Sequence, residues 1–359
     1  MKKTILVVVL LFTIILTVAC SPKQTSPNSE TQPEVEPETT TEDDMVKEDM
    51  PEYFVYTANE DDATVSVINM ATMETTTTIS VGQGPHNVQV SPDGKYVYVA
   101  ENKDNTVSAI DTSNNSVVKT ISVGEGPSHV IFSPDSSTAY VTVNEMAEDE
   151  TDSDDMDMKT TGNVYVINVT SGNIETKIPV GYMPHGLRFS SDNKYIFVAN
   201  NDSDNVSVID VATNQVTKTI EVGKKPVQVA PTPDGKFVFV SLNEDHSVAV
   251  IDTATLEVIK TIPVGKNPIQ LSSTPDSKFI YVANTESDNI SVIDTATQSV
   301  ISFIPAGDKA HGVAISKDGS TVFVTNTGAN NITVVDTATN SVIDTISAGK
   351  APNGVTIME

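Results

Sequence analysis

Residues 85–124 read PHNVQVSPDGKYVYVAENKDNTVSAIDTSNNSVVKTISVG, and this stretch decides the fold because close copies of it recur along the chain. It contains four short phrases that alternate apolar with polar side chains or run through β-branched and aromatic residues, which is the periodicity of β-strands. Between the first two phrases, Pro92-Asp93-Gly94 combines a fixed φ with a residue that tolerates positive φ, as a tight antiparallel turn requires. The unit therefore predicts a four-stranded antiparallel sheet.

The unit recurs seven times, as shown by its closing dipeptide, Val-Gly or Ala-Gly. The glycines of this dipeptide are Gly82, Gly124, Gly181, Gly223, Gly265, Gly307 and Gly349. Their separation is 42 residues throughout, except for one of 57, so one copy carries an insertion at residues 145–160. Four strands in a unit of about 40 residues, repeated four to eight times, indicate a β-propeller. We predict an all-β, seven-bladed β-propeller over residues 53–359, with four antiparallel strands per blade.

The two ends of the repeat array are incomplete in a complementary way. The first copy starts at Tyr53 with the second phrase, whereas the chain ends with the first phrase at residues 352–357. Three N-terminal strands and one C-terminal strand then complete a single blade. Pairing them removes the two sheet edges that an open array would expose. We therefore predict a ring that is closed by its own termini.

The residues before the repeats predict export. Residues 1–19 combine a basic start with an apolar run too short for a membrane span, which is the layout of a secretory signal peptide. Residues 17–20, TVAC, resemble a bacterial lipobox, in which the cysteine receives diacylglycerol; Thr17 departs from the usual Leu, and an ordinary signal peptide with a chance cysteine is the alternative. Cys20 is the only cysteine, so no intramolecular disulfide is possible. We expect a lipid on Cys20 that anchors the protein to the membrane, facing the cell exterior or periplasm.

The segment from the lipidated cysteine to the first repeat, residues 20–52, is acidic and rich in Pro, Thr and Glu, with few large apolar side chains. Such a composition cannot build a core, and its like charges repel one another. We expect a disordered linker that holds the propeller away from the membrane.

The second phrase of several copies carries a family resemblance. It reads YVAEN at residues 98–102, IFVAN at 196–200, YVAN at 281–284 and VFVTN at 322–326. With the Pro-His-Gly, Ser-Pro-Asp-Gly and Val-Ile-Asp-Thr phrases around them, these segments resemble the YVTN-repeat, surface-layer-type family of β-propellers. The resemblance implies a secreted or surface-layer propeller whose members generally bind other molecules, and it brings no single catalytic motif.

Four of the five histidines follow the Pro or Ala that opens an innermost strand: His86, His129, His185 and His311. In a propeller these positions meet around one mouth of the central channel, where imidazoles bind a metal or an acidic ligand. The alternative is that each ring packs against the next blade and bonds a backbone carbonyl. We expect the three in matching register, His86, His185 and His311, to lie too far apart to share one ion.

Arg188 is the only arginine, and it lies three residues after His185 on the same innermost strand. The preferred interpretation is that Arg188 is a buried partner for one of the recurrent aspartates. The alternative is that its guanidinium group recognises an anion at the channel through paired hydrogen bonds. If an anionic small molecule binds, we expect it at Arg188 together with His185, His129 and His86.

The insertion at residues 145–160 is acidic and contains three methionines. Aspartate oxygens suit Ca²⁺ and thioether sulfurs suit Cu⁺, but the segment lacks the glycine and spacing of an EF-hand, and acidic runs are usually solvated surface. The candidate ligands are Asp152, Asp154, Asp155, Met156, Asp157 and Met158. No other cofactor is predicted.

The net charge and the absence of common catalytic and nucleotide-binding motifs argue against several classes of function. The chain has 48 acidic and 21 basic residues and a net charge of -27, which opposes binding to nucleic acid. It contains no G-x-S-x-G, Walker, H-E-x-x-H or C-x-x-C motif. The near-identical blades also favour binding over catalysis, because an active site departs from the repeat. We therefore predict a monomeric ring that acts as a binding or interaction scaffold for a protein, glycan or small ligand at the cell envelope. The alternatives are a lactonase or hydrolase with its site at the histidine-lined mouth, and a structural surface-layer component.

Overall fold

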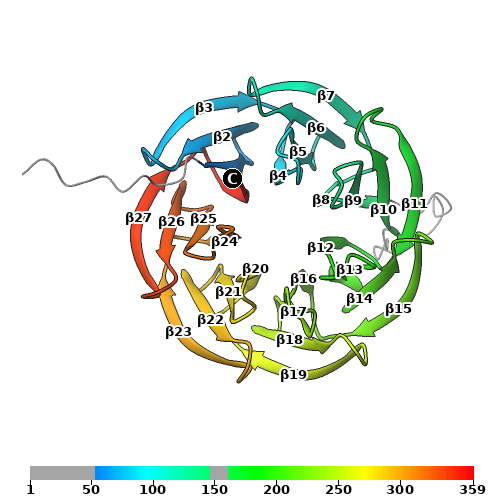
Figure 1. The fold of residues 1–359 in the computed structure, drawn as a ribbon, viewed down its shortest axis with the longest axis vertical. Helices are drawn as coiled ribbons and strands as arrows, with labels where there is room; N and C mark the ends of the chain where they lie inside the picture. The colour runs from blue at the N-terminus through cyan, green and yellow to red at the C-terminus, as the bar shows by residue number, and fades with distance from the viewer. Residues whose placement is uncertain (1–52, 146–160) are drawn as a thin grey trace, which may run out of the picture. The chain divides into compact units, whose positions relative to one another are not determined.

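The computed structural model describes residues 53–145 and 161–359, which form a ring of seven four-stranded antiparallel sheets around a common axis (Figure 1). The predicted all-β, seven-bladed propeller is confirmed. The predicted signal peptide at 1–19, the predicted linker at 20–52 with Cys20, and insertion residues 146–160 lie outside the described residues. Among the described residues, no helix is long and apolar enough to cross a membrane.

Each blade places one strand at the channel and one at the rim. The innermost strands are β4 (Pro85–Val90), β8 (Val130–Phe132), β12 (Pro184–Phe189), β16 (Pro226–Pro231), β20 (Pro268–Ser273), β24 (Ala310–Ile315) and β28 (Pro352–Met358). The second strands are β1 (Phe54–Asn59), β5 (Tyr96–Glu101), β9 (Thr138–Glu145), β13 (Tyr195–Asn200), β17 (Phe237–Leu242), β21 (Phe279–Asn284) and β25 (Thr321–Asn326). The third strands are β2 (Thr64–Asn69), β6 (Thr106–Asp111), β10 (Thr161–Asn168), β14 (Asn205–Asp210), β18 (Ser247–Asp252), β22 (Asn289–Asp294) and β26 (Asn331–Asp336). The outer strands are β3 (Glu74–Ser80), β7 (Ser116–Ser122), β11 (Ile174–Val180), β15 (Gln215–Glu221), β19 (Glu257–Pro263), β23 (Ser299–Pro305) and β27 (Ser341–Ser347), and a 3-10 turn, η1 (Asn201–Ser203), follows β13.

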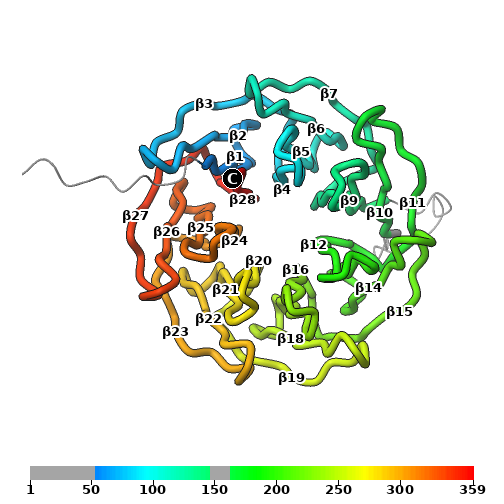
Figure 2. The backbone as a smooth tube through the Cα atoms, viewed as in Figure 1, coloured from blue at the N-terminus to red at the C-terminus, as the bar shows by residue number. Residues whose placement is uncertain are grey.

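One sheet is built from both ends of the repeat array. Its strand order is β28-β1-β2-β3, so the last strand of the chain is the innermost strand of the first blade. Phe54 pairs with Met358 and Val55 with Ile357 across this junction, where the two ends lie side by side (Figure 2). The predicted closure by three N-terminal strands and one C-terminal strand is confirmed.

The apolar core lies between neighbouring blades. In β21 every residue after Phe279 is buried, because both faces of the strand meet another sheet. Tyr281 of β21 belongs to one apolar cluster with Val313 and Val322 of the next blade. By contrast, outer strand β27 buries only Ile346. The YVAN-type runs are therefore continuous because each strand must fill two interfaces.

A repeated asparagine ties two of the blades to the linker that precedes each of them. In one blade, Nδ2 of buried Asn326 donates to Asn331 at 2.8 Å and to Thr333 at 2.9 Å, while its Oδ1 accepts from the amide of Gly307 at 3.0 Å. A Cβ on Gly307 would lie 2.8 Å from the Asn326 side chain, so glycine is required at this close approach. The asparagine of the repeated phrase therefore has a structural role.

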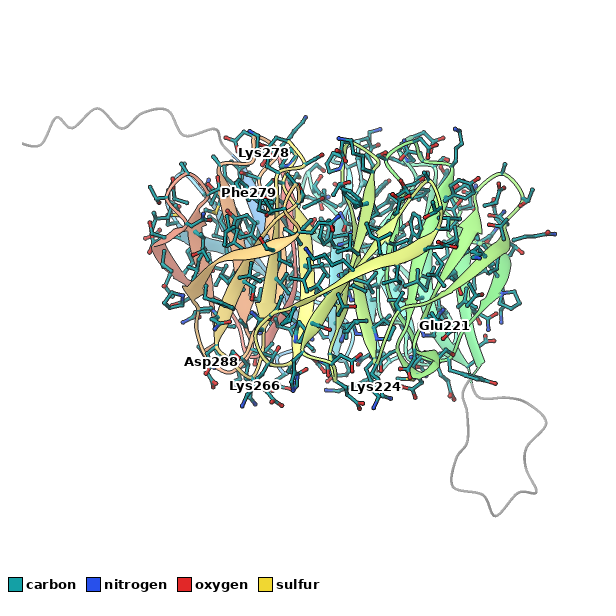
Figure 3. The ribbon with its side chains drawn as sticks, turned by 90° about the horizontal axis from the view of Figure 1, so that it is seen from below. Glu221, Lys224, Lys266, Lys278, Phe279 and Asp288 are labelled. Atoms are coloured by element: carbon teal, nitrogen blue, oxygen red, sulfur yellow. The ribbon has the colours of Figure 1, made fainter. Side chains whose placement is uncertain are left out.

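The ring has two different faces (Figure 3). One face, here called the linker face, carries the linkers between blades, marked by Lys224 and Lys266, and the turns between second and third strands, marked by Asp288. The opposite face carries the turns that follow the innermost strands, marked by Lys278. Every innermost strand therefore starts at the linker face.

Candidate ligand-binding site

The starts of the innermost strands bring four histidines to the channel mouth at the linker face. His86, His185 and His311 each occupy the second position of an innermost strand. His129 comes one position later in its copy and precedes the regular strand, which begins at Val130. These four residues are here called the imidazole cluster.

An irregular strand start places His129 in the cluster. The backbone amide of His129 donates to Oγ1 of Thr142 at 2.9 Å, and the amide of Thr142 donates to the carbonyl of His129 at 3.0 Å. These contacts fix the backbone at this point, and the His129 side chain is completely buried. His129 is therefore the fully buried member of the imidazole cluster, although it lies one position out of register with the other three histidines.

The imidazole rings converge closely. Ring centroids are 4.7 Å apart for His129 and His185, 5.1 Å for His86 and His185, and 5.7 Å for His86 and His129. The ring of His311 lies 6.3 Å from that of His86. The expectation that His86, His185 and His311 lie too far apart to share one ion is wrong for the first two. The reason is that the histidine side chains of β4 and β12 both reach the channel mouth, so two blades that are not neighbours along the ring still meet there.

Two of the rings are oriented by the next blade. Nδ1 of His86 lies 3.2 Å from the carbonyl oxygen of Ser128, and Nδ1 of His185 lies 3.1 Å from that of Val227. A carbonyl oxygen only accepts, so Nδ1 carries the proton in the neutral ring and Nε2 keeps its lone pair. The predicted bond to a neighbouring carbonyl is confirmed for these two histidines, and each keeps one nitrogen that can bind a ligand.

Other polar atoms at the mouth lack a protein partner. Both ring nitrogens of His129 and Nδ1 of His311 are buried without a hydrogen bond. The same holds for Nε2 of Gln228 on β16 and Nε2 of Gln270 on β20. Buried polar atoms are nearly always satisfied in folded proteins, by protein groups or by water or ions. Five such atoms on or next to the innermost strands are therefore free to take a partner from the channel, whether water, an ion or another ligand.

Burial keeps these imidazoles neutral. It lowers the pKa of His129 and of His185 well below the ordinary value, and nearby imidazoles add to the effect. Burial lowers the pKa of His311 to about 3. It also lowers the pKa of His86, although the Glu60 carboxylate and the carbonyl of Ser128 act in the other direction. At neutral pH the cluster therefore presents lone pairs rather than positive charge.

The half-buried Arg188 has no acidic partner among residues 53–145 and 161–359. Its Nη1 donates to the carbonyl of Leu187 at 2.9 Å, and burial lowers its pKa to about 10. The preferred interpretation, a structural pair with a recurrent aspartate, is therefore wrong. Those aspartates serve the outer turns instead; Asp210, for example, accepts from the amide of Thr213 at 2.9 Å. The other interpretation, recognition of an anion by Arg188, stays a prediction.

A small cavity of about 250 Å³ opens beside the cluster. Its lining includes His185, His311, Met183, Asn144, Asn201 and Asn243. The asparagines and glutamines of this mouth were not singled out from the sequence, although aligning the innermost strands places Gln228 and Gln270 level with His129. The cavity has room for an ion with its ligands or for a small molecule.

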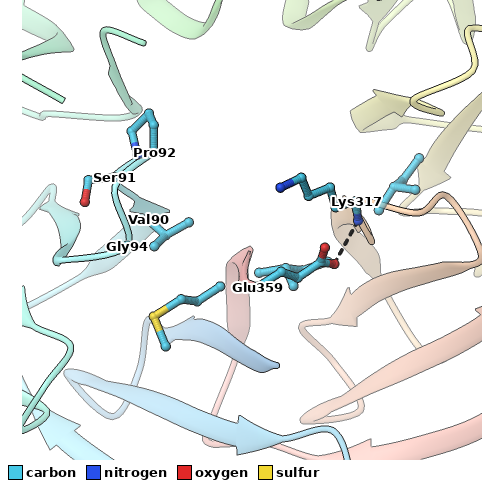
Figure 4. A pocket seen from close by; sticks show the side chains of 9 residues that line it. Val90, Ser91, Pro92, Gly94, Lys317 and Glu359 are labelled. Atoms are coloured by element: carbon cyan, nitrogen blue, oxygen red, sulfur yellow. Dashed lines mark hydrogen bonds between the residues drawn. The ribbon is translucent and has the colours of Figure 1, made fainter. Parts of the chain in front are cut away.

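A second cavity, of about 300 Å³, lies at the opposite face beside the chain end (Figure 4). There the amide of Lys317 donates to Oε1 of Glu359 at 2.8 Å, and Pro92 and Ser91 form part of the wall. It holds no histidine. The imidazole cluster is therefore the stronger candidate site.

The candidate Ca²⁺ or Cu⁺ ligands of the insertion lie outside the described residues, and the hypothesis stays a prediction. These residues are Asp152, Asp154, Asp155, Met156, Asp157 and Met158.

Comparison with known proteins gives a family match and two similar folds. The profile of the family described as YNCE-like beta-propeller matches residues 50–359. The solved structure titled Kuenenia stuttgartiensis Hydrazine Synthase superposes with a TM-score of 0.68 at 22% identity, covering 79% of this chain and 92% of that one. A functionally unknown protein from Desulfotomaculum acetoxidans gives a TM-score of 0.71 at 16% identity, covering 85% and 99%. At these identities the likeness shows the fold alone, and no curated protein matches the chain.

Proposed function

The chain belongs to the YNCE-like β-propeller family, and we propose that it is a binding module that holds a small ligand in the imidazole cluster. The observation that carries this proposal is the convergence of His86, His129 and His185, with ligand nitrogens within 4.8 Å of one another and no protein partner for His129. Leaving both nitrogens of a buried imidazole unsatisfied costs about 1–3 kcal/mol per group. A bound ligand removes that cost.

The size of the mouth favours a small ligand over a protein or glycan. The cavity beside His185 and His311 measures about 250 Å³, below the usual range for drug-sized ligands. A stable protein partner would instead bury roughly 800 Å² on each side. An ion or a molecule of a few atoms fits the observed space.

Binding is also favoured over hydrolysis. Hydrolytic chemistry by the alternative lactonase mechanism needs a base held by a third group, in the manner of a triad. The two oriented rings, those of His86 and His185, are held by backbone carbonyls, which do not supply a proton-accepting carboxylate.

We also propose that the protein acts outside the membrane, because its N-terminal residues have the layout of an export signal. The signal peptide at residues 1–19, the lipid expected on Cys20 and the linker at 20–52 support a ring held outside the membrane on a stalk. The ligand would then be one that is present at the cell surface or in the periplasm.

Native mass spectrometry of the full chain tests the proposal. The protein is purified from its own cell envelope without chelators, and the expected result is one small species bound per chain. The His129→Leu variant should lose this species, whereas His246→Asn should keep it, because His246 is exposed and lies outside the cluster. A wild-type mass equal to that of the bare mature chain would contradict the proposal and favour the structural surface-layer alternative.

A further inference from the structure

Resting on the binding function proposed above, we infer that the ligand is a single Zn²⁺ ion, bound by Nε2 of His86, Nε2 of His185 and one ring nitrogen of His129. These three side chains form the one group among residues 53–145 and 161–359 whose ligand atoms lie close enough together to hold a metal ion. The site belongs to three consecutive blades, since β4, β8 and β12 are successive innermost strands (Figure 1).

The spacing of the rings matches a three-histidine zinc site. Three imidazoles that bind one Zn²⁺ at about 2.0–2.1 Å with near-tetrahedral angles have ring centroids about 5 Å apart. The observed centroid distances among His86, His129 and His185 are 4.7, 5.1 and 5.7 Å. Small rotations would bring the nitrogens, now within 4.8 Å of one another, to the separation of about 3.3 Å that a shared zinc ion requires.

The rings are also tilted in the way that a shared ion requires. The interplanar angles are 82° for His86 and His185, 68° for His86 and His129, and 50° for His129 and His185. None of the pairs is stacked face to face. The nitrogen lone pairs lie in the ring planes, so tilted planes allow them to meet at a common point, whereas planes stacked face to face do not.

The hydrogen bonds made by Nδ1 of His86 and of His185 have the form found in zinc sites. Histidine ligands of metals almost always donate their other ring N–H to a carbonyl, carboxylate or water, which fixes the tautomer and the ring orientation. The carbonyls of Ser128 and Val227 do this for Nδ1 of His86 and of His185. Both carbonyls belong to the next blade, so the fold supplies the outer shell of the site.

The ligand types select zinc over other common ions. Ca²⁺ and Mg²⁺ need oxygen ligands, and Cu⁺ prefers thiolate or thioether sulfur, which the three histidines do not provide. Cu²⁺ and Ni²⁺ favour square-planar or tetragonal sites, whereas three mutually tilted rings around one mouth suit the tetrahedral preference of Zn²⁺.

The fourth zinc position faces the mouth cavity and takes an exchangeable ligand. His185 lines that cavity together with His311, so a fourth ligand enters from the linker face. Arg188 is close enough to act electrostatically on His129, and its positive charge disfavours a bare dication. An anion in the fourth position would offset this charge.

Calorimetric titration tests the inference on the purified full chain after removal of metal with a chelator and exchange into metal-free buffer. The expected result with ZnCl₂ is one binding event per chain that depends on the cluster, whereas any binding of CaCl₂ or MgCl₂ should be the same in the cluster variants as in the wild type. His129→Leu and His86→Gln should each weaken zinc binding at least 100-fold, and His246→Asn should leave it unchanged. Cobalt in place of zinc should give the strong visible absorption of a four-coordinate site, and both cluster variants should lose it.

Two results would overturn the zinc assignment: no saturable zinc binding by the wild-type protein, or zinc binding by His129→Leu and His86→Gln as tight as in the wild type. Circular dichroism of each variant shows whether the ring is intact, so a loss of binding is not mistaken for a loss of fold. If zinc fails to bind while the native protein carries another small species, the zinc assignment is wrong and the binding function stands. If neither zinc nor any native species binds, both proposals are wrong.

Discussion

The amide of Gly349 donates a hydrogen bond of 3.1 Å to Oδ1 of Asn59, across 290 residues of intervening chain. The same contact joins Gly307 to Asn326 at 3.0 Å inside an uninterrupted blade. The blade that closes the ring therefore uses the same tie as the blade before it. The closing blade differs from the others in that its innermost strand, β28, and its second strand, β1, pair without a connecting loop.

Deleting residues 351–359 should destabilise the whole ring, because it removes β28 and leaves the edge of β1 unpaired. The expected loss is several kcal/mol, which lowers Tm by about 10 °C or more for a domain of this size. Differential scanning calorimetry of the full chain measures it. Removing Glu359 alone is the control, since it keeps β28 and should shift Tm by less than about 2 °C. An unchanged Tm after the nine-residue deletion would show that the ring does not depend on closure.

Replacing Asn326 by alanine should cost about 2–4 kcal/mol of unfolding free energy. The change removes the bonds to Asn331 and Thr333 and leaves the Gly307 amide without its acceptor in a part-buried place. Urea unfolding measures the difference. The matched control is Asn114→Ala, whose bonds to Ser116 are exposed, and we expect it to cost less than about 1 kcal/mol. Equal costs for the two variants would contradict the structural role of the repeated asparagine.

Acid should destabilise the ring through the turns on the face opposite the linkers. Hydrogen bonds lower the pKa of Asp93, Asp192 and Asp276 to about 2; the main partner is Lys95 for Asp93, Ser190 for Asp192 and Lys278 for Asp276. Because the folded pKa lies below the ordinary value of 3.8, the stabilisation is complete above about pH 4 and is lost as the pH falls from 4 to 2.

The triple Asp→Asn variant at these three positions tests this pH dependence. These aspartates are largely exposed, so each should contribute only a few tenths of a kcal/mol. The variant should show a smaller decrease in unfolding free energy between pH 4 and pH 2, measured by urea titration at each pH. An identical slope for wild type and variant would exclude these turns as a source of the acid sensitivity.

The architecture was predictable because its causes are local and repeated. A period of 42 residues, strand phrases with the right alternation and turn residues between them are each readable without tertiary contacts. The closure at Phe54 and Met358 followed from the register of the phrases at the two ends. A repeat protein places equivalent residues in equivalent environments, so one correct assignment extends to all seven blades.

The site was predictable only in part, because its geometry depends on distances across the channel. The Pro-His phrases placed His86 and His185 at one mouth, but only the structure shows that their centroids are 5.1 Å apart. His129 enters the cluster through an irregular strand start that no periodicity signals. The missing acidic partner of Arg188 likewise depends on which residues face the channel, and sequence spacing does not contain that information.

Replacing Cys20 by serine should release the protein from the membrane. A lipid chain on this cysteine would contribute about 0.8 kcal/mol per buried CH₂ to membrane binding, and serine has no thiol to receive it. Detergent phase partitioning of whole-cell extracts should place the wild type in the detergent phase and the variant in the aqueous phase. If the wild type already partitions into the aqueous phase, Cys20 is a chance residue of an ordinary signal peptide.

Replacing His129 by leucine should stabilise the metal-free protein while abolishing its response to zinc. The buried imidazole has two nitrogens without partners, so an apolar side chain of similar size removes a desolvation cost of about 1–3 kcal/mol. This gain corresponds to a rise in Tm of roughly 2–8 °C in chelator. Zinc at 100 times its dissociation constant should stabilise the wild type by about 2.7 kcal/mol, and the variant by nothing. If His129→Leu instead lowers Tm in chelator, the imidazole already has a favourable partner in the metal-free protein, and the argument from its unsatisfied nitrogens is wrong.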